Sequence, residues 1–223
     1  MGWLYRSLNS SIGKKFVMAI TGVSLISFLV IHLAGNFTLY FGPEAFNGYV
    51  QALDIVKPVI RIVEVILALI FILHIINAIR LYIENWKANP QTYAVNASGK
   101  NSTIYSRTMI WTGTIVFIFL VLHLATMWYS FNFGHSPDPG HLNYFNVLVE
   151  WFQSPIYAIV YVVAVIMLGF HLNHGFQSAF QTFGWNHKKY FDMIKKLGTL
   201  VSIVFALGFA SFPIYFSFFY GGN

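Results

Sequence analysis

Hydrophobic residues run in five long stretches along this chain, separated by shorter polar segments. Their approximate limits are residues 16–40, 59–83, 104–130, 155–180 and 197–219. A helix rises about 1.5 Å per residue, so each stretch is long enough to cross the roughly 30 Å hydrocarbon layer of a bilayer. No stretch alternates apolar and polar residues as a barrel strand does, and backbone groups in lipid must be satisfied internally. The pattern predicts an all-α fold, with residues 1–223 forming one transmembrane domain of five spanning helices.

Composition excludes several classes of protein. Hydrophobic residues make up 57% of the chain and charged residues only 9%, whereas soluble domains carry about 25% charged residues. We therefore reject a soluble helical bundle. The chain has no cysteine, which excludes thiolate-held iron–sulfur clusters, disulfides and haem attached through cysteine. Any redox centre must be held by histidine or by shape alone.

Basic residues predict the orientation in the membrane. Eleven of the thirteen Lys and Arg fall in the N-terminal segment and in the second-to-third and fourth-to-fifth connections, which share one side. They are Arg6, Lys14, Lys15, Arg80, Lys87, Lys100, Arg107, Lys188, Lys189, Lys195 and Lys196. The positive-inside rule places this side in the cytoplasm, with the N-terminus, and the C-terminus outside. Topology thus explains the net charge of +6, and we expect no nucleic acid partner.

The segments outside the spans carry two further expectations. Residues 1–15 are short and polar and run directly into the first apolar stretch without a small-residue cleavage site, so we expect that helix to be retained. The outer connection from Phe131 to Ser154 is predicted to be a loop, and its second half, His141–Phe152, to form a short helix lying on the membrane surface.

Histidines occur in each of the first four spans: His32, His74, His123 and His171, with His174 one turn beyond the last. An ionisable residue inside a membrane span is costly, and it indicates function by default. A single one is often only a packing residue. One in each of four consecutive spans is harder to explain in that way.

The depths of these histidines place them at two levels. On the outward-running first and third helices, His32 and His123 lie eight and seven residues before the outer ends, about 10–12 Å below the outer boundary. On the inward-running second and fourth helices, His74 and His171 lie fifteen and sixteen residues after the outer ends, about 22–24 Å below that boundary. We therefore predict an outer pair, His32 with His123, and an inner pair, His74 with His171.

Two pairs at separate levels suit two b-type haems, each with two axial imidazoles from different helices. A zinc site is a weaker interpretation, because zinc favours three or four ligands at one level. Glycines near these positions, such as Gly22 and Gly113, fit flat macrocycles, although close helix packing uses glycine as well. The recurrent His-Leu-Ala at His32 and His123 suggests that the first two helices are loosely repeated in the third and fourth.

With these residues in place, the chain resembles the cytochrome b subunit of succinate dehydrogenases and fumarate reductases, in its single-subunit, five-helix, two-haem class. His74 follows His32 by 42 residues, a spacing typical of that family. The matching segments are Ile20-Thr21-Gly22-Val23, Ile31-His32-Leu33, Glu44-Ala45-Phe46-Asn47 and His171-Leu172-Asn173-His174-Gly175-Phe176. The last pattern implies that His171, rather than His174, is the ligand.

The resemblance implies more than the spacing shows. Members of the family anchor a flavoprotein, which interconverts succinate and fumarate, and an iron–sulfur protein. Both partners would sit on the basic, cytoplasmic side of a bacterial inner membrane. Electrons would pass the inner and then the outer haem and reach quinone, typically menaquinone, near the outer surface. Two departures matter: Met18 and Ala19 stand where one-haem anchors carry His-Arg, and Gly169 stands where some fumarate reductases carry a glutamate.

Quinone reduction takes up two protons, so a quinone site needs a proton carrier near water. Asp54 and Glu44, in the first outer loop or at the mouth of the second helix, are the candidates, with Asp54 preferred. The simpler interpretation is a solvated loop carboxylate. Glu64 lies within reach of Arg61 and is interpreted as a structural ion pair. His174 is a candidate contact for a haem propionate, or a packing residue.

Two other functions fit the same sequence features. One is the dihaem anchor of another quinone-linked enzyme, such as a hydrogenase or formate dehydrogenase. The other is a non-redox transporter that uses membrane histidines.

Overall fold

The computed structural model describes residues 2–88, 103–134 and 143–221. Within these ranges the chain is helical and contains no strand. Five helical segments are long and apolar enough to cross a membrane. They are Ser11–Phe41 (α2, Ser11–Asn36, with η1, Phe37–Phe41), Lys57–Ala88 (α4), Met109–Phe133 (α7, Met109–His123, with η2, Leu124–Trp128, and α8, Tyr129–Phe133), Pro155–Thr182 (α10) and Lys188–Phe218 (α11). The chain is therefore an all-α, multi-pass membrane protein, as the apolar pattern predicts.

The spanning helices begin where capping groups stand, so they extend beyond the apolar stretches. The first begins at Ser11 rather than near residue 16, because the Ser10 hydroxyl accepts a hydrogen bond from the Gly13 amide at 3.0 Å. The fifth begins at Lys188 rather than near 197, where the ring of His187 accepts from the Lys189 amide. The third stretch is interrupted at its start: Ile104–Arg107 forms a separate short helix, α6, before α7 begins.

Short helices also replace predicted connections. The segment with Glu44 and Asp54, expected as a loop, is helix α3 (Pro43–Ile55), and Pro43 stands in its first turn, where its missing amide proton costs nothing. The short helix expected over His141–Phe152 is α9 (Tyr144–Gln153), capped by Asn143. The remainder of that predicted loop, residues 135–142, lies outside the described residues, as does Lys100. A further helix, α1 (Trp3–Asn9), precedes α2.

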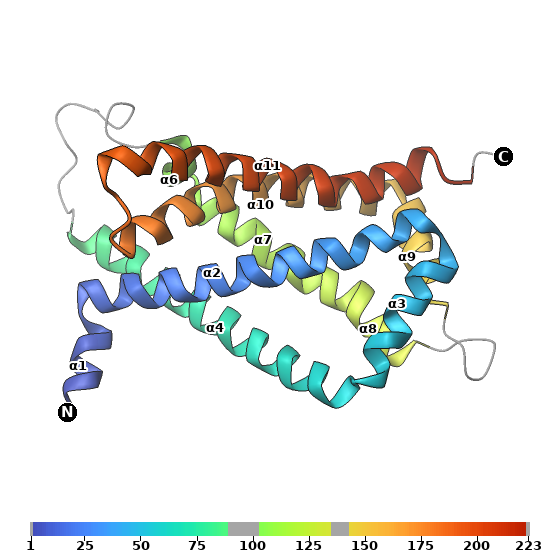
Figure 1. Cartoon of the computed structure of the whole chain (residues 1–223), viewed down its shortest axis with the longest axis horizontal. Helices are drawn as coiled ribbons and strands as arrows, with labels where there is room; N and C mark the ends of the chain where they lie inside the picture. Colours follow the sequence, from blue (N-terminus) through green and yellow to red (C-terminus); the bar gives the residue numbers. More distant parts are fainter. Residues whose placement is uncertain (1, 89–102, 135–142, 222–223) are drawn as a thin grey trace.

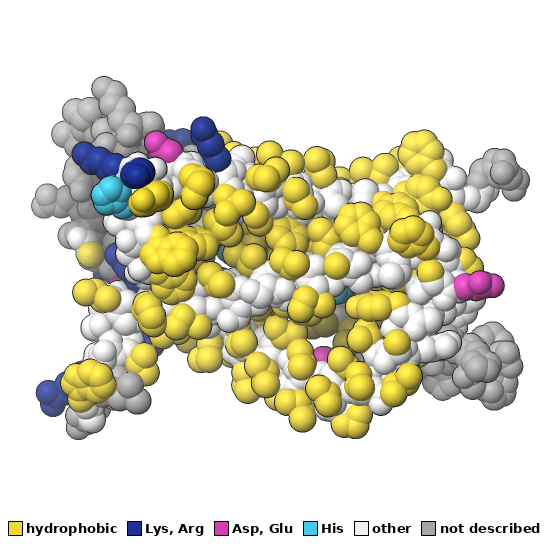
Figure 2. Space-filling model, viewed as in Figure 1, with side chains coloured by type: hydrophobic (Ala, Val, Ile, Leu, Met, Phe, Trp, Pro, Cys, Tyr) yellow, Lys and Arg dark blue, Asp and Glu magenta, His cyan; other side chains and the backbone are white. Residues whose placement is uncertain are grey.

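The long helices run side by side, with the two termini at opposite ends (Figure 1). We call the end that carries the N-terminus the inner end and the other the outer end. The Lys and Arg side chains visible in Figure 2 gather at the inner end, and apolar side chains cover the flanks. This distribution agrees with the charge pattern of the sequence.

Protein side chains pack tightly in one part of the bundle and loosely in another. Helices α10 and α11 lie against each other along their length, and at the outer end α9 closes over them with Phe145 and Phe152 buried. Helix α4 differs: of its 32 residues only Asn77 is buried. It crosses α2 near the inner end and diverges from it toward the outer end (Figure 1).

Polar contacts hold this crossing together. The buried Asn77 amide donates to the Lys14 backbone carbonyl of α2 at 2.6 Å. The Lys14 ammonium, itself buried, pairs with Glu84 about two turns further along α4. Two adjacent links between the same helices fix their crossing point.

We expect Asn77→Ala to lower the free energy of unfolding by about 1 kcal/mol, the usual size of an interhelical hydrogen bond in a membrane. Ser24→Ala is the matched control, because the Ser24 hydroxyl bonds only to its own helix, at the Ile20 carbonyl. Unfolding in mixed detergent micelles measures both. Equal stability of Asn77→Ala and the parent would show that this bond does not hold α4.

Candidate functional site

The structure brings His32 of α2 and His123 of α7 together near the outer end. Their ring centroids lie 5.9 Å apart and their planes are nearly perpendicular, at 87°. The two residues are far apart in sequence and come from the two helices that the depth argument pairs. Neither Nδ1 of His123 nor Nδ1 of His171 has a side-chain hydrogen-bond partner among the described residues, although both atoms are buried.

His74 of α4 and His171 of α10 form the corresponding inner pair. Their ring centroids lie 6.3 Å apart at an interplanar angle of 65°. The four imidazoles thus come from four different helices and meet two by two. The structure contains the two histidine pairs that the sequence predicts. The role of the four histidines as metal ligands stays a prediction.

Two glycines show how far apart the pairs lie. A Cβ added at Gly22 of α2 would sit 3.6 Å from Cε1 of His74, and one at Gly113 of α7 would sit 3.2 Å from Cε1 of His171. Gly22 therefore marks the inner level on α2, ten residues before His32. At about 1.5 Å per residue the two levels are about 15 Å apart, close to the predicted separation of about 12 Å.

Aromatic side chains surround the outer pair. Phe28 stacks on His32 with centroids 5.2 Å apart, and Phe119 lies 5.9 Å from His123. Tyr161 of α10 also contacts His123, at 6.4 Å. The fifth helix, which carries no histidine, contributes Phe209 at 5.7 Å from His32. Aromatic residues spread over all five spans give no sequence signal for these contacts.

The inner pair has a polar neighbour that the sequence argument does not assign. The Thr21 hydroxyl oxygen of α2 lies 3.1 Å from Nδ1 of His74. Thr21 is part of the Thr-Gly segment that carries the family resemblance, but nothing in the sequence alone places it beside a histidine on another helix.

The geometry of each pair suits a metal ion bound between its two imidazoles, as in a haem held by two histidines. Two imidazoles bound to one metal ion at about 2.0–2.1 Å have ring centroids about 6 Å apart, which is the size of both observed separations. The inward stripe of α4, which includes Leu67, Phe71 and His74, is only half-buried. Protein interiors are normally close-packed, and this side of α4 is not. The described residues contain no cluster of three or more His, Cys, Asp or Glu that suits zinc.

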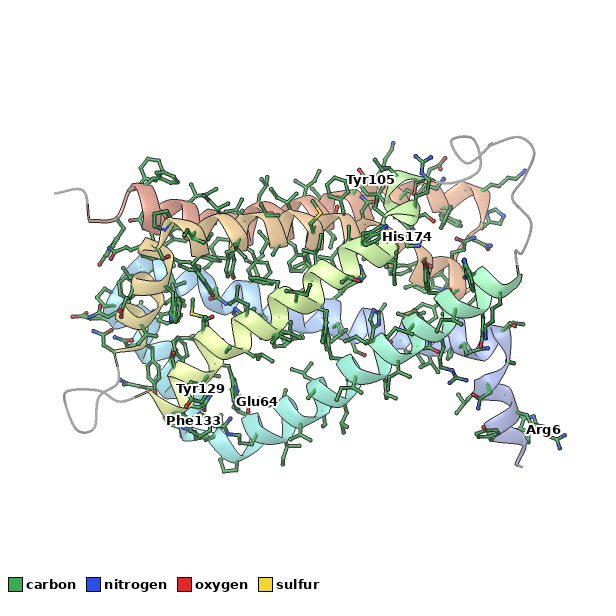
Figure 3. All side chains as sticks on the ribbon, turned by 180° about the vertical axis from the view of Figure 1, so that it is seen from behind. Arg6, Glu64, Tyr105, Tyr129, Phe133 and His174 are labelled. Carbon is green, nitrogen blue, oxygen red and sulfur yellow. The ribbon has the colours of Figure 1, made fainter. Side chains whose placement is uncertain are left out.

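A polar cluster lies in the outer half of the bundle, between α4 and the π-helical turn η2. Glu64 accepts hydrogen bonds from Arg61 at 2.6 Å and from the Trp128 indole at 3.2 Å, and Arg61 also binds Asn132. Figure 3 shows Glu64 directed from α4 toward α8. In Figure 2 the surface between α2 and the outer half of α4 is hollowed, with an acidic side chain at the bottom. The predicted pair of Arg61 and Glu64 is present, and it is part of a larger cluster.

The two carboxylates predicted for quinone chemistry lie elsewhere. Asp54 is near the end of α3, where it pairs with Lys57 at 2.9 Å and accepts from the Tyr144 hydroxyl at 3.0 Å. The Lys57 hydrogen bond, helped by that of Tyr144, holds the pKa of the Asp54 carboxyl below its ordinary value. Burial and the neighbouring Asp54 raise the pKa of Tyr144. Glu44 stands in the first turn of α3, at the outer end.

His174 is separate from both imidazole pairs. It lies on α10 at the level of α6, in the part of the bundle where Figure 3 also labels Tyr105. It forms no ring pair with another histidine among the described residues. Gly169, two residues before His171, packs against Ala206 of α11, so a larger residue there would press on the fifth helix.

Comparison with known proteins gives one match. The family model described as the succinate dehydrogenase/fumarate reductase transmembrane subunit matches twice, over residues 16–100 and 87–210. No curated protein and no solved structure matches the sequence. The first segment contains His32 and His74, and the second contains His123 and His171, so each supplies one member of each pair. Because the two segments together span most of the chain, this protein belongs to the family of transmembrane subunits of succinate dehydrogenases and fumarate reductases.

Proposed function

We propose that this chain is the dihaem membrane anchor of a succinate:quinone oxidoreductase or quinol:fumarate reductase. The observation that carries the proposal is the meeting of four imidazoles from four helices in two pairs at separate levels. His32 and His123 would bind one b-type haem, and His74 and His171 the other. When bound, each haem supplies a one-electron centre with two nitrogen ligands.

Chemistry on the dicarboxylate belongs to partner subunits in this proposal. Oxidation of succinate to fumarate releases two electrons and two protons, and reduction of quinone to quinol takes up two of each. An iron–sulfur subunit would deliver the electrons at the inner end, in the cytoplasm of a bacterium, and a flavoprotein would carry out the succinate step. The cluster of Lys and Arg side chains at the inner end supports docking of the partner subunits on this side (Figure 2).

Quinone would react at the outer end, beside the outer pair. The polar cluster of Arg61, Glu64 and Trp128 supports a binding site there, since the guanidinium of Arg61 has several N–H groups that can donate hydrogen bonds to carbonyl oxygens. Glu64 lies seven residues inside α4, about 10 Å below its outer end, at the depth of His32. Asp54 lies outside this cluster, on α3, where it pairs with Lys57 and binds Tyr144. Glu64 is likewise ion-paired, with Arg61, so its depth in the membrane is what favours it as the proton carrier.

Two other functions make different predictions for the isolated complex. An anchor of a hydrogenase or formate dehydrogenase would copurify with a nickel or molybdenum enzyme rather than with a flavoprotein. A non-redox transporter would bind no haem, and dithionite would produce no b-type absorption band.

We expect His171→Ala to lower the haem content by about one haem per chain, because it removes one ligand of the inner pair. His174→Ala should keep the full content, since His174 pairs with no other imidazole. Pyridine haemochrome assay of the purified variants measures both. Equal loss in the two variants would mean that the wrong residue of this helix is assigned as ligand.

We expect Glu64→Gln to slow quinone turnover by about a hundredfold or more, the usual scale of a lost proton carrier, with haem content unchanged. Asp54→Asn is the matched control, because it makes the same carboxyl-to-amide change outside the hollow and should remain close to the parent. Steady-state turnover with a soluble menaquinone analogue measures both. A slow Asp54→Asn with a normal Glu64→Gln would return the proton-carrying role to Asp54.

A further inference from the structure

Among the described residues, Thr21 is the threonine whose hydroxyl lies within hydrogen-bond distance of the imidazole ring of a paired histidine. The Thr21 hydroxyl oxygen lies 3.1 Å from Nδ1 of His74 and 2.8 Å from the Val17 backbone carbonyl of its own helix. Thr21 is buried, so its position is fixed by packing against α4. The contact joins α2 to the inner pair, although α2 supplies its own histidine to the outer pair.

The hydrogen-bond pattern assigns the tautomer of His74. A hydroxyl has one proton, and the closer acceptor for it is the Val17 carbonyl, in the backbone bond that threonine commonly forms within a helix. The Thr21 oxygen then faces His74 as an acceptor. His74 therefore carries its proton on Nδ1, and Nε2 keeps the lone pair that a metal requires.

A matched threonine elsewhere in the chain lacks this contact. The dipeptide Thr-Gly occurs in α2, at Thr21, and again in α7, at Thr112. In both places the tripeptide His-Leu-Ala comes later along the same spanning segment. Thr112 is also buried and also precedes a glycine that touches an inner imidazole. Its hydroxyl, however, donates to the Met109 carbonyl of its own helix at 3.1 Å, and within the described residues it has no bond to a histidine.

We propose that Thr21 is a positioning residue that fixes the ring of His74 and increases its electron donation to the metal. This inference rests on the proposed dihaem function. A ligating imidazole that donates its second N–H to an acceptor is a stronger base and a better donor. Stronger donation favours the oxidised metal, so Thr21 lowers the reduction potential of the centre at the inner pair.

The consequence concerns the direction in which electrons pass through the bundle. Nδ1 of His123 in the outer pair and Nδ1 of His171 in the inner pair both lack a hydrogen-bond partner among the described residues. The acceptor at His74 is thus a feature of one member of the inner pair, and it has no counterpart at His123. It sets the inner centre at a lower potential than it would otherwise have, and this favours passage of electrons from the inner level to the outer one.

The test compares Thr21→Val, Thr21→Ser and Thr112→Val in the purified complex. Valine keeps the shape of threonine and removes the acceptor, whereas serine keeps the oxygen. Potentiometric titration of the b-type absorption band resolves the two centres, and the transition lost in His171→Ala identifies the inner one. We expect Thr21→Val to shift that transition upward by about 59 mV, equivalent to a tenfold change in the ratio of oxidised to reduced centre, and the other two variants to match the parent.

Other results separate this inference from the proposed function. Absence of b-type haem in the parent complex would refute the proposed function itself. Two haems in the parent with unshifted transitions in Thr21→Val would overturn the role of Thr21 alone. An equal shift in Thr112→Val would also overturn it, because packing next to the pair would then explain both. If Thr21→Val instead loses one haem, retention of both in Thr21→Ser and Thr112→Val supports the positioning role.

Discussion

Placement of imidazole rings inside a membrane is the constraint on which the rest of this structure depends. A polar ring in hydrocarbon is costly unless it binds a partner. The chain carries one such ring on each of four spanning helices, and the fold brings them into two close pairs, His32 with His123 and His74 with His171. No two of the four come from the same helix, so a group bound at the outer pair would join α2 to α7, and one bound at the inner pair would join α4 to α10.

The uneven packing of the bundle follows from the same arrangement. Helices α10 and α11 bury a continuous interface of small and aromatic residues, and they form the rigid side of the protein. Helix α4 buries only Asn77 among its residues, and beyond its crossing with α2 it is held by a few side-chain contacts, such as those of Glu64 with Trp128 and of Arg61 with Asn132. Under the proposed function, such a sparsely packed helix would depend for part of its stability on the group that His74 binds. Binding of that group and folding of α4 would then be coupled.

Much of this organisation can be read from the sequence, because it depends on one-dimensional spacing. Apolar runs locate the five spans, and counting residues from their ends is enough to pair His32 with His123 and His74 with His171, since helical rise converts position into depth. Helix starts are less well predicted, because Ser10 and His187 extend α2 and α11 into polar sequence through caps. Helix α3 is missed for a similar reason: its polar and aromatic residues have no long apolar run.

Contacts between helices could not be predicted in this way. Rotation of each helix about its axis decides that Thr21 faces His74 and that Glu64 meets Trp128, at the end of the π-helical turn. The spacing of residues along one helix carries no information about the rotation of another. For the same reason, the sequence could not show that Asp54 pairs with Lys57 and binds Tyr144.

Near-infrared magnetic circular dichroism of the oxidised, purified complex, combined with haem quantitation, would show whether the paired histidines bind haem. We expect two haems per chain, both low-spin and both with the charge-transfer band of two imidazole ligands. A single haem, or a high-spin centre in the intact protein, would contradict this expectation.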